Sequence, residues 1–314
     1  MERRVFGPVP SRRLGKSLGV NNIPYKICTY SCIYCQVGKA IKMQINRQEF
    51  YKPDDLAGEV KELLNHIQNE KDYPDYITIV PDGEPTLDIN LGVLIEKLKM
   101  LGVPLAVITN ASLIDQPEVQ NELLKADFVS FKADSFSPET WKKINIPHKQ
   151  LDLQRIKEGI RVFRNYFSGK MVTETMLVKG VNDSPEELKN TARVIQGFKP
   201  DVAYIAIPTR PPAFKKVEPS DEGTVNTAYH IFKEYIKNVE LLTGYEGNAF
   251  ASAGNFRDDL LSITAVHPMR EDAVLELLDK TDGNKNSLEV LLQENLVEKV
   301  QYSGHSYYLR KFTR

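Results

Sequence analysis

Three cysteines stand in one short stretch at C-x3-C-x2-C spacing, Cys28, Cys32 and Cys35, and they are all the cysteines of the chain. Three thiolates that close together can bind one polynuclear metal centre, and they are one fewer than the four that iron–sulfur cubes ordinarily use. A structural zinc site would need a fourth Cys or His at a regular spacing, and no nearby histidine supplies one. The spacing therefore predicts a [4Fe–4S] cluster with one iron open for a substrate or cosubstrate.

The composition is that of a globular protein without a disulfide framework. The 314 residues are 41% hydrophobic and 26% charged, which suits one large domain or one domain with a small appendage. Three cysteines in so long a chain indicate a reducing compartment. The N-terminus lacks the apolar region of a signal peptide, and no segment approaches the run of about 18 apolar residues that a membrane span needs. We therefore expect a cytoplasmic protein with no membrane partner.

The net charge of −1 hides a strong asymmetry. Residues 1–47 carry nine Lys or Arg side chains and one acidic side chain, a net charge of +8, so the remainder carries −9. A basic segment beside a metal loop favours an anionic substrate, such as a phosphorylated metabolite, a nucleotide or RNA. The alternative is that these cations neutralise the cluster or acidic groups of the core, and the sequence leaves both interpretations open.

Apolar strands alternate with amphipathic helices along most of the chain. We expect strands over 18–23, 76–80, 104–109, 128–132, 171–178 and 202–207. We expect helices over 53–68, 91–100, 117–125, 138–144, 153–166, 185–197 and 227–241. This alternation predicts a parallel sheet covered by helices, and about six units are fewer than the eight of a closed TIM barrel. The expected fold class is therefore α/β, a partial (β/α)6 TIM-type barrel.

Polar residues gather at the ends of the predicted strands. Successive strands are followed by the cysteine loop, Gly83-Glu84, Thr109-Asn110, Lys132-Ala133-Asp134 and Arg210. In parallel sheets ligands collect beyond the carboxyl ends of the strands, so we expect these groups to surround one site. A Rossmann protein would carry G-x-G-x-x-G after its first strand, and neither that motif nor a P-loop is present.

The composition changes near residue 244. We expect a partial-barrel domain over 1–243, a connection rich in Gly, Ala, Ser and Asn over 244–256, and a small module over 257–314.

The small module has the pattern of a winged helix. It is expected to contain two helices and a hairpin, formed by residues 270–279, 286–296, 297–300 and 307–309. From Arg270 onward there are seven basic and eight acidic residues, which disfavours DNA as its ligand. Packing against the barrel, or binding a protein or peptide, is favoured instead.

The cysteine spacing resembles that of the radical S-adenosylmethionine (SAM) superfamily, including the aromatic residue before the third cysteine, here Tyr34. About fifty residues further on, Asp82-Gly83-Glu84-Pro85 follows a predicted strand and resembles the family's Gly-Gly-Glu-Pro motif, with Asp82 replacing the first Gly. In the family this motif binds the amino group of SAM. The resemblance therefore implies that Gly83, Glu84 and Pro85 contact SAM, with Glu84 as the charged partner of that ammonium.

Weaker matches follow at later strand ends. Thr109-Asn110-Ala111-Ser112 resembles the family's T-N-G stretch, with Ala111 in place of Gly. Lys132-Ala133-Asp134 ends the fourth strand, where related enzymes place groups that contact the SAM carboxylate or ribose. Asn and Asp at strand ends are also common as caps or turns. The resemblance nevertheless implies SAM contacts by Thr109, Asn110, Ser112, Lys132 and Asp134. Glu174 in the fifth strand is expected either to join them in the barrel mouth or to lie on the surface.

The segment from Pro8 to Gly38, which contains the cysteine loop, looks like the corresponding segment of the iron–sulfur oxidoreductases grouped near the wyosine tRNA-modifying radical SAM enzymes. Those enzymes use a second iron–sulfur cluster, and this chain has no cysteines left for one. That departure disfavours the same reaction unless a partner supplies ligands, and it also disfavours enzymes that need auxiliary clusters.

The resemblance implies a radical SAM enzyme with one [4Fe–4S] cluster on Cys28, Cys32 and Cys35 and with SAM on the open iron. A one-electron donor such as a flavodoxin or ferredoxin would reduce the cluster, and SAM would then be cleaved to a 5′-deoxyadenosyl radical that removes hydrogen from a substrate. Arg12, Arg13 and Arg210 are the candidates for anchoring an anionic substrate, because a guanidinium can bind phosphate or carboxylate bidentately.

Three functions remain open at this point. The basic first segment and the wyosine-like resemblance favour a nucleotide or RNA substrate. The near-neutral C-terminal module favours a peptide or protein substrate, including glycyl-radical activation. A non-enzymatic iron–sulfur or zinc scaffold is the third function.

Overall fold

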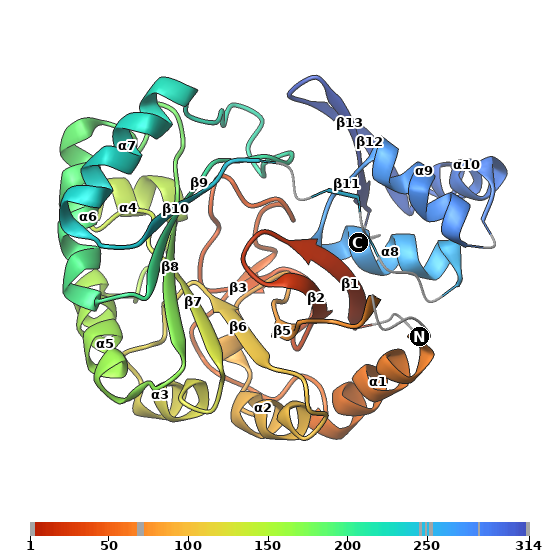
Figure 1. The fold of residues 1–314 in the computed structure, drawn as a ribbon, viewed down its shortest axis with the longest axis horizontal. Coiled ribbons are helices and arrows are strands. Elements are labelled where there is room, and N and C mark those ends of the chain that lie inside the picture. The colour runs from red at the N-terminus through yellow and green to blue at the C-terminus, as the bar shows by residue number, and fades with distance from the viewer. Residues whose placement is uncertain are drawn as a thin grey trace.

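A curled eight-stranded sheet forms the body of the protein (Figure 1). The computed structural model describes residues 4–67, 72–244, 247–248, 250, 254–281 and 283–311. Neighbouring strands from β2 to β10 are parallel, and the edge strand β1 is antiparallel to β2. The strands lie in the order β1 (Val5–Ser11), β2 (Gly15–Val20), β5 (Tyr76–Ile79), β6 (Leu105–Thr109), β7 (Phe128–Lys132), β8 (Lys170–Met176), β9 (Val202–Ala206) and β10 (Val239–Leu242).

Helices connect the parallel strands and cover the outer face of the sheet (Figure 1). Strands β2, β5, β6, β7, β8 and β9 are each followed by helix before the next strand of the sheet, which confirms the predicted partial (β/α)6 barrel. The helix predicted over 53–68 ends at His66, and residue 68 lies outside the described residues. The helices are α1 (Pro53–His66), the 3-10 helix η2 (Pro85–Leu87), α2 (Leu91–Lys99), α3 (Pro117–Leu123), α4 (Pro138–Asn145), α5 (Leu153–Tyr166), α6 (Pro185–Phe198) and α7 (Glu222–Tyr235).

Local sequence signals explain where these helices begin. A proline occupies the first turn of α1, α3, α4 and α6, where its missing N–H costs no helical hydrogen bond. The side chains of Asp152 and Ser184 accept hydrogen bonds from backbone N–H groups in the first turns of α5 and α6. The predicted starts of all five helices agree with the structure. Of the helices within the described ranges, none is long and apolar enough to cross a membrane.

The two faces of the sheet carry separate apolar layers. In β9, Ala203 and Ile205 join the large core between the sheet and the helices, whereas Val202 and Tyr204 join a smaller cluster on the concave face. Successive side chains of a strand point to opposite faces, so this division follows from the strand geometry. Because both faces are buried, β9 is a continuous apolar run, as expected for a parallel sheet.

A small module of three helices and a three-stranded sheet follows β10. The two predicted helices and the predicted hairpin are present, whereas the sequence did not predict α8 and β11. The strand order is β11-β13-β12. The elements are α8 (Phe256–Val266), β11 (Met269–Arg270), α9 (Glu271–Lys280), α10 (Lys285–Gln293), β12 (Val297–Tyr302) and β13 (His305–Arg310).

Strand β1 joins the module to the barrel. Phe6 and Val9 of β1 pack in one hydrophobic cluster with Phe256 and Leu260 of α8. Figure 1 shows β1 next to the module on the open side of the curled sheet. The domain limits expected at 243 and 257 stay a prediction, since part of the connection lies outside the described residues, namely 245–246, 249 and 251–253.

Two strands of the large sheet differ from the sequence-based expectation. The helix predicted over 227–241 begins earlier, ends at Tyr235, and is followed by β10, which pairs with β9. Only the two end residues of β10 are buried, and their spacing of three residues matches one face of a helix rather than the alternation of a strand. Strand β1 contains Pro8 and Pro10, which usually argue against a strand. They are tolerated because β1 lies at the sheet edge and its register shifts between Phe6 and Val9.

Candidate active site

The three cysteines lie on one loop that faces a single cavity. The loop follows β2, beyond the carboxyl ends of the parallel strands, and its short strand β3 (Ile27–Cys28) pairs with β4 (Lys42–Met43). Backbone N–H groups of Ser31 and Ile33 donate to carbonyl oxygens at the end of α4, at 3.0 and 2.9 Å. All three thiols line a cavity of about 300 Å³. The strand-end groups that share this cavity with them include Gly83, Glu84, Thr109, Asn110, Lys132 and Arg210.

Gly83 allows the end of β5 to touch the cysteine loop. A Cβ atom at this position would lie 2.0 Å from the carbonyl oxygen of Ile27 and 2.7 Å from the side chain of Ile23. The same carbonyl accepts a hydrogen bond from the backbone N–H of Glu84 at 3.2 Å. Only glycine fits so close an approach, so Gly83 sets the distance between the loop and the strand.

Glu84 is a buried carboxylate held by four hydrogen bonds. Its Oε1 accepts from the N–H and hydroxyl of Thr86 at 3.1 and 2.6 Å and from the hydroxyl of Thr109 at 2.6 Å. Its Oε2 accepts from the backbone N–H of Asn110 at 2.8 Å. Burial raises the pKa of Glu84, and the hydrogen bonds oppose that rise. Oε2 accepts one hydrogen bond and can accept another, and Glu84 lines the cavity.

The stretch that follows β6 packs against the cysteine loop. The side-chain Nδ2 of Asn110 donates to the hydroxyl of Thr29 at 2.7 Å, and the hydroxyl of Ser112 lies 2.7 Å from the same oxygen. Ala111 has a φ of +64°, a left-handed conformation that glycine adopts more easily. This backbone conformation is a physical reason for the glycine in the family's T-N-G stretch. Ser112 is buried behind Thr29 and does not line the cavity.

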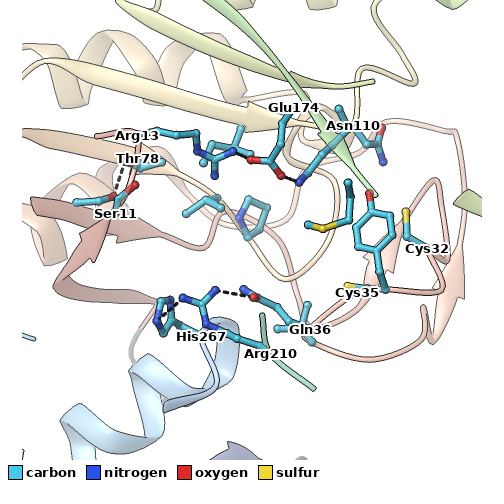
Figure 2. Close-up of a pocket in the computed structure, with 18 of the residues that line it drawn as sticks. Ser11, Arg13, Cys32, Cys35, Gln36, Thr78, Asn110, Glu174, Arg210 and His267 are labelled. Atoms are coloured by element: carbon cyan, nitrogen blue, oxygen red, sulfur yellow. Dashed lines mark hydrogen bonds and ion pairs between the residues drawn. The ribbon is translucent and has the colours of Figure 1, made fainter. Parts of the chain in front are cut away.

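Two cations share one carboxylate on another part of the cavity wall. Glu174 of β8 forms ion pairs with the guanidinium of Arg13 and the ammonium of Lys132, and all three residues line the cavity (Figure 2). The side chain of Glu174 is 5% exposed, so of the two predicted positions it occupies the barrel mouth. Burial and the nearby charge of Arg13 lower the pKa of Lys132 to about 8. At neutral pH this wall therefore carries net positive charge.

Asp134 lies behind the cysteine loop. Its carboxylate accepts hydrogen bonds from the hydroxyl of Tyr34, from Nδ2 of Asn145 at 2.7 Å and from the N–H of Met176 at 2.9 Å. Tyr34 lines the large cavity, whereas Asp134 does not. Pro85, the first residue of η2, is likewise buried outside that lining. SAM contacts by Asp134, Ser112 and Pro85 stay predictions, and these side chains serve to fix their neighbours.

Arg210 lies where the barrel meets the C-terminal module. Its guanidinium donates to Oε1 of Gln36 at 2.8 Å and to Nε2 of His267 at 2.9 Å (Figure 2). Burial, with the charges of Arg210 and Arg12, holds the pKa of His267 well below its usual value. The neutral ring can therefore accept a hydrogen bond at Nε2 from Arg210. The sequence did not point to Gln36 or His267, because scattered polar residues give no pattern.

The wing of the module holds the loop that carries Arg210. The hydroxyl of Tyr302 donates to the carbonyl oxygen of Pro208 at 2.9 Å, and that of Tyr307 donates to Thr209 at 2.9 Å. With His267, the module thus makes three hydrogen bonds to residues 208–210. Packing against the barrel was one of the expected roles of this module, and these contacts show it.

Much of the basic first segment is engaged inside the structure. Arg12 lines the cavity, and its Nη1 donates to the carbonyl oxygens of Leu242 and Gly244 at the end of β10. Arg4 pairs with a glutamate of α1, and Arg47 with Glu122 of α3. Lys39 and Lys42 are exposed, and Arg3 lies outside the described residues. The charge count of residues 1–47 therefore reflects internal ion pairs as well as surface potential.

Each cysteine sulfur accepts a hydrogen bond from nitrogen. Lys26 Nζ lies 3.3 Å from Cys35, Asn145 Nδ2 lies 3.4 Å from Cys32, and Asn110 Nδ2 lies 3.7 Å from Cys28. Lys26 is one of the cations of residues 1–47, for which neutralising the cluster was one of the two predicted roles. No pattern in the sequence marks Asn145, which is 113 residues from Cys32.

The three cysteines and the groups that surround them fit a [4Fe–4S] cluster. Lys26 is 3% exposed and donates to a cysteine sulfur, and a buried ammonium of this kind is stabilised by the negative charge that three cluster thiolates bring. Among the described residues, no three Cys, His, Asp or Glu side chains converge to hold a single metal ion. A cube binds its cysteines through different iron atoms and does not need that convergence, whereas zinc does.

Cys28 and Cys32 are held as neutral thiols when no metal is bound. Burial raises the pKa of Cys28 to about 12 and raises the pKa of Cys32 well above its usual value. Metal ligation requires thiolates, so binding must displace these protons.

Comparison with known proteins identifies the class. The family model described as Radical SAM superfamily matches residues 22–194, more than half of the chain. The chain therefore belongs to the radical SAM superfamily, which confirms the resemblance seen in the cysteine spacing, and membership implies an enzyme. It is also 44% identical over 307 residues to UPF0026 protein MJ1312 of Methanocaldococcus jannaschii, an alignment that covers 97% of this chain and 95% of that protein.

Solved structures share the fold at low identity. A radical SAM methyltransferase from Sphaerobacter thermophilus aligns with a TM-score of 0.54 at 13% identity, over 72% of this chain and 66% of that chain. Streptococcus suis SuiB bound to S-adenosylmethionine aligns with a TM-score of 0.53 at 14% identity, over 73% of this chain. The chain spans about half of SuiB, 51% of its length. These likenesses concern the partial-barrel fold alone.

Gly83→Ala tests the close approach of β5 and the cysteine loop. The added methyl must displace the carbonyl of Ile27, so we expect the variant to lose about 1–3 kcal/mol in its free energy of unfolding. Urea denaturation measures the loss. Gly58→Ala in α1 is the matched control, because a Cβ there meets nothing within 4 Å and alanine favours a helix. Equal urea midpoints for the two variants would contradict this close packing of Gly83 against Ile27.

Proposed function

We propose that this chain binds one [4Fe–4S] cluster through Cys28, Cys32 and Cys35, binds SAM beside it, and abstracts hydrogen from an anionic substrate. The observation that carries the proposal is one shared cavity, lined by the three thiols, by the Glu84 carboxylate and by a cationic wall. The bound cluster would supply the electron that cleaves SAM to a 5′-deoxyadenosyl radical. The residues of the chain bind and orient both ligands and exclude competing hydrogen donors.

Glu84 is the proposed partner of the SAM ammonium. Glu84 lines the cavity that holds the cysteines, its Oε2 accepts one hydrogen bond from the chain, and an ammonium at this carboxylate would offset its burial. Gly83, Thr109, Asn110 and Tyr34 line the same cavity and are proposed to shape the SAM site.

The proposed substrate carries a phosphate or carboxylate group. Arg13, Lys132 and Arg210 line the cavity, and of these the first two share the single carboxylate of Glu174. This arrangement supports a small anionic group, such as that of a nucleotide, inside the cavity. RNA has less support, because Arg4, Arg12 and other cations of the basic first segment have internal partners. A peptide substrate, including a glycyl-radical protein, stays the alternative.

The proposed electron donor is a small acidic carrier of the flavodoxin or ferredoxin type. Radical SAM enzymes need such a donor, and the surface just after Cys35 carries Lys39 and Lys42 around Ile41, which is 70% exposed. A basic rim around an apolar centre suits a transient acidic partner.

Anaerobic reconstitution with iron and sulfide tests the cluster. The wild type should gain the brown absorbance of a cluster and should cleave SAM after reduction with dithionite. Cys32→Ala should fold, as circular dichroism would show, but should lose both properties, since two cysteines cannot hold the cube. A Cys32→Ala protein that keeps its cluster and cleaves SAM would refute the ligand assignment. Metal uptake without any SAM cleavage by the wild type would support a scaffold instead.

Glu84→Gln tests the ammonium contact. The amide keeps the size of the side chain but removes the charge, so we expect SAM to bind at least tenfold more weakly, about 1.4 kcal/mol. Equilibrium dialysis with labelled SAM on the reconstituted protein measures the affinity. Glu62→Gln on the exposed part of α1 is the control and should bind SAM as the wild type does. An unchanged affinity in Glu84→Gln would remove Glu84 from the SAM site.

Deuterium transfer identifies the substrate class. The reconstituted enzyme is incubated with SAM, reductant and deuterated cell extract, which is separated into RNA, nucleotide and peptide fractions. We expect deuterium in 5′-deoxyadenosine with the nucleotide fraction, and we expect this activity to survive RNase. Transfer only from RNA, lost after RNase treatment, would support an RNA substrate, and transfer only from the peptide fraction would support the alternative.

A further inference from the structure

Lys26 is both charged and buried beside the cysteine loop. Its backbone has a φ of +58°, which is uncommon for a residue with a Cβ atom. The N–H groups of Ile41 and Lys42 hold that conformation by donating to the Lys26 carbonyl oxygen at 3.0 and 3.3 Å. The ammonium then donates to the sulfur of Cys35 at 3.3 Å. The loop thus places a positive charge directly against one proposed cluster ligand.

Asn145 presents its amide N–H2 to the sulfur of Cys32, and its orientation is fixed by Asp134. A carboxylate can only accept, so the atom 2.7 Å from Asp134 Oδ2 must be the nitrogen of Asn145. The same nitrogen lies 3.4 Å from the sulfur of Cys32. Asp134 is itself held by the Tyr34 hydroxyl and by the N–H of Met176. This network gives Asp134 the role of a positioning residue.

Asn110 is oriented in the same way toward Cys28. The backbone N–H of Ser112 can only donate, and it lies 2.9 Å from Oδ1 of Asn110. The nitrogen of that amide is therefore turned toward the hydroxyl of Thr29 at 2.7 Å and toward the sulfur of Cys28 at 3.7 Å.

We infer that Lys26, Asn145 and Asn110 raise the reduction potential of the cluster by donating hydrogen bonds to its three cysteine sulfurs. Donors and positive charge near the sulfurs stabilise the reduced cluster, which carries one more electron. Lys26 has the largest effect, because a full charge in a buried site interacts more strongly than an amide dipole. The inference rests on the proposed function, since it concerns the cluster that these cysteines would hold.

The test is a redox titration of the reconstituted full-length protein, followed by electron paramagnetic resonance without substrate. Lys26→Met should shift the one-electron equilibrium at least tenfold toward the oxidised cluster, a fall of 59 mV. Lys26→Arg, which keeps the charge, should stay near the wild-type potential. Asn145→Leu should shift the potential in the same direction as Lys26→Met but by less. Lys42→Met is the matched control, because Lys42 is exposed in the same segment and gives only its backbone N–H to this network.

Iron and sulfide analysis of each sample separates the two possible failures. A loaded Lys26→Met protein with the potential of Lys42→Met would overturn the inference and leave the cluster assignment intact. A wild-type protein that takes up no iron would instead refute the proposed function. If Lys26→Met loads poorly, Lys26→Gln gives the same comparison, since it keeps a donor without the charge. An unshifted potential in loaded Lys26→Gln and Asn145→Leu would overturn the inference.

Discussion

The buried carboxylate of Glu84 is the constraint on which the rest of the site depends. Its hydrogen-bond donors come from η2 and from the end of β6, and its own N–H is bound to the cysteine loop. A buried carboxylate without such partners would be costly, so these three segments cannot separate without exposing it or leaving it unpaired. Gly83 completes the arrangement by letting the backbones touch. Strand ends that are distant in sequence therefore form one rigid wall of the cavity.

The parts of this site that are local in sequence could be predicted, and those assembled from distant polar residues could not. The cysteines, Gly83-Glu84 and Thr109-Asn110 each form a motif at the end of an apolar strand, so pattern and topology together placed them at one cavity. Asn145 is the last residue of α4 and His267 directly follows α8; each is a single polar residue without a motif around it, and only the folded chain shows what it contacts. The charge of the first segment left two interpretations open for the same reason, because a count of cations does not show which carbonyl or carboxylate each one meets.

The C-terminal module packs against the open side of the barrel and acts as part of its wall. A half-open sheet leaves its edge strand and its concave face accessible to water. Here β1 packs its Phe6 and Val9 against α8, while Tyr302, Tyr307 and His267 bind the loop that follows β9. Radical chemistry requires a site closed to competing hydrogen donors. The module therefore contributes His267 to the cavity wall and holds Arg210 in place, and its nearly neutral charge is consistent with a role in packing.

The neutral thiols of Cys28 and Cys32 affect how the protein reacts with oxidants before any metal is bound. Oxidants, alkylating agents and disulfides react with thiolates far faster than with thiols. Because burial keeps the pKa of Cys28 near 12 and that of Cys32 well above normal, these two residues are thiols rather than thiolates at neutral pH. Burial therefore protects the sulfurs of Cys28 and Cys32 from premature oxidation until a metal displaces their protons.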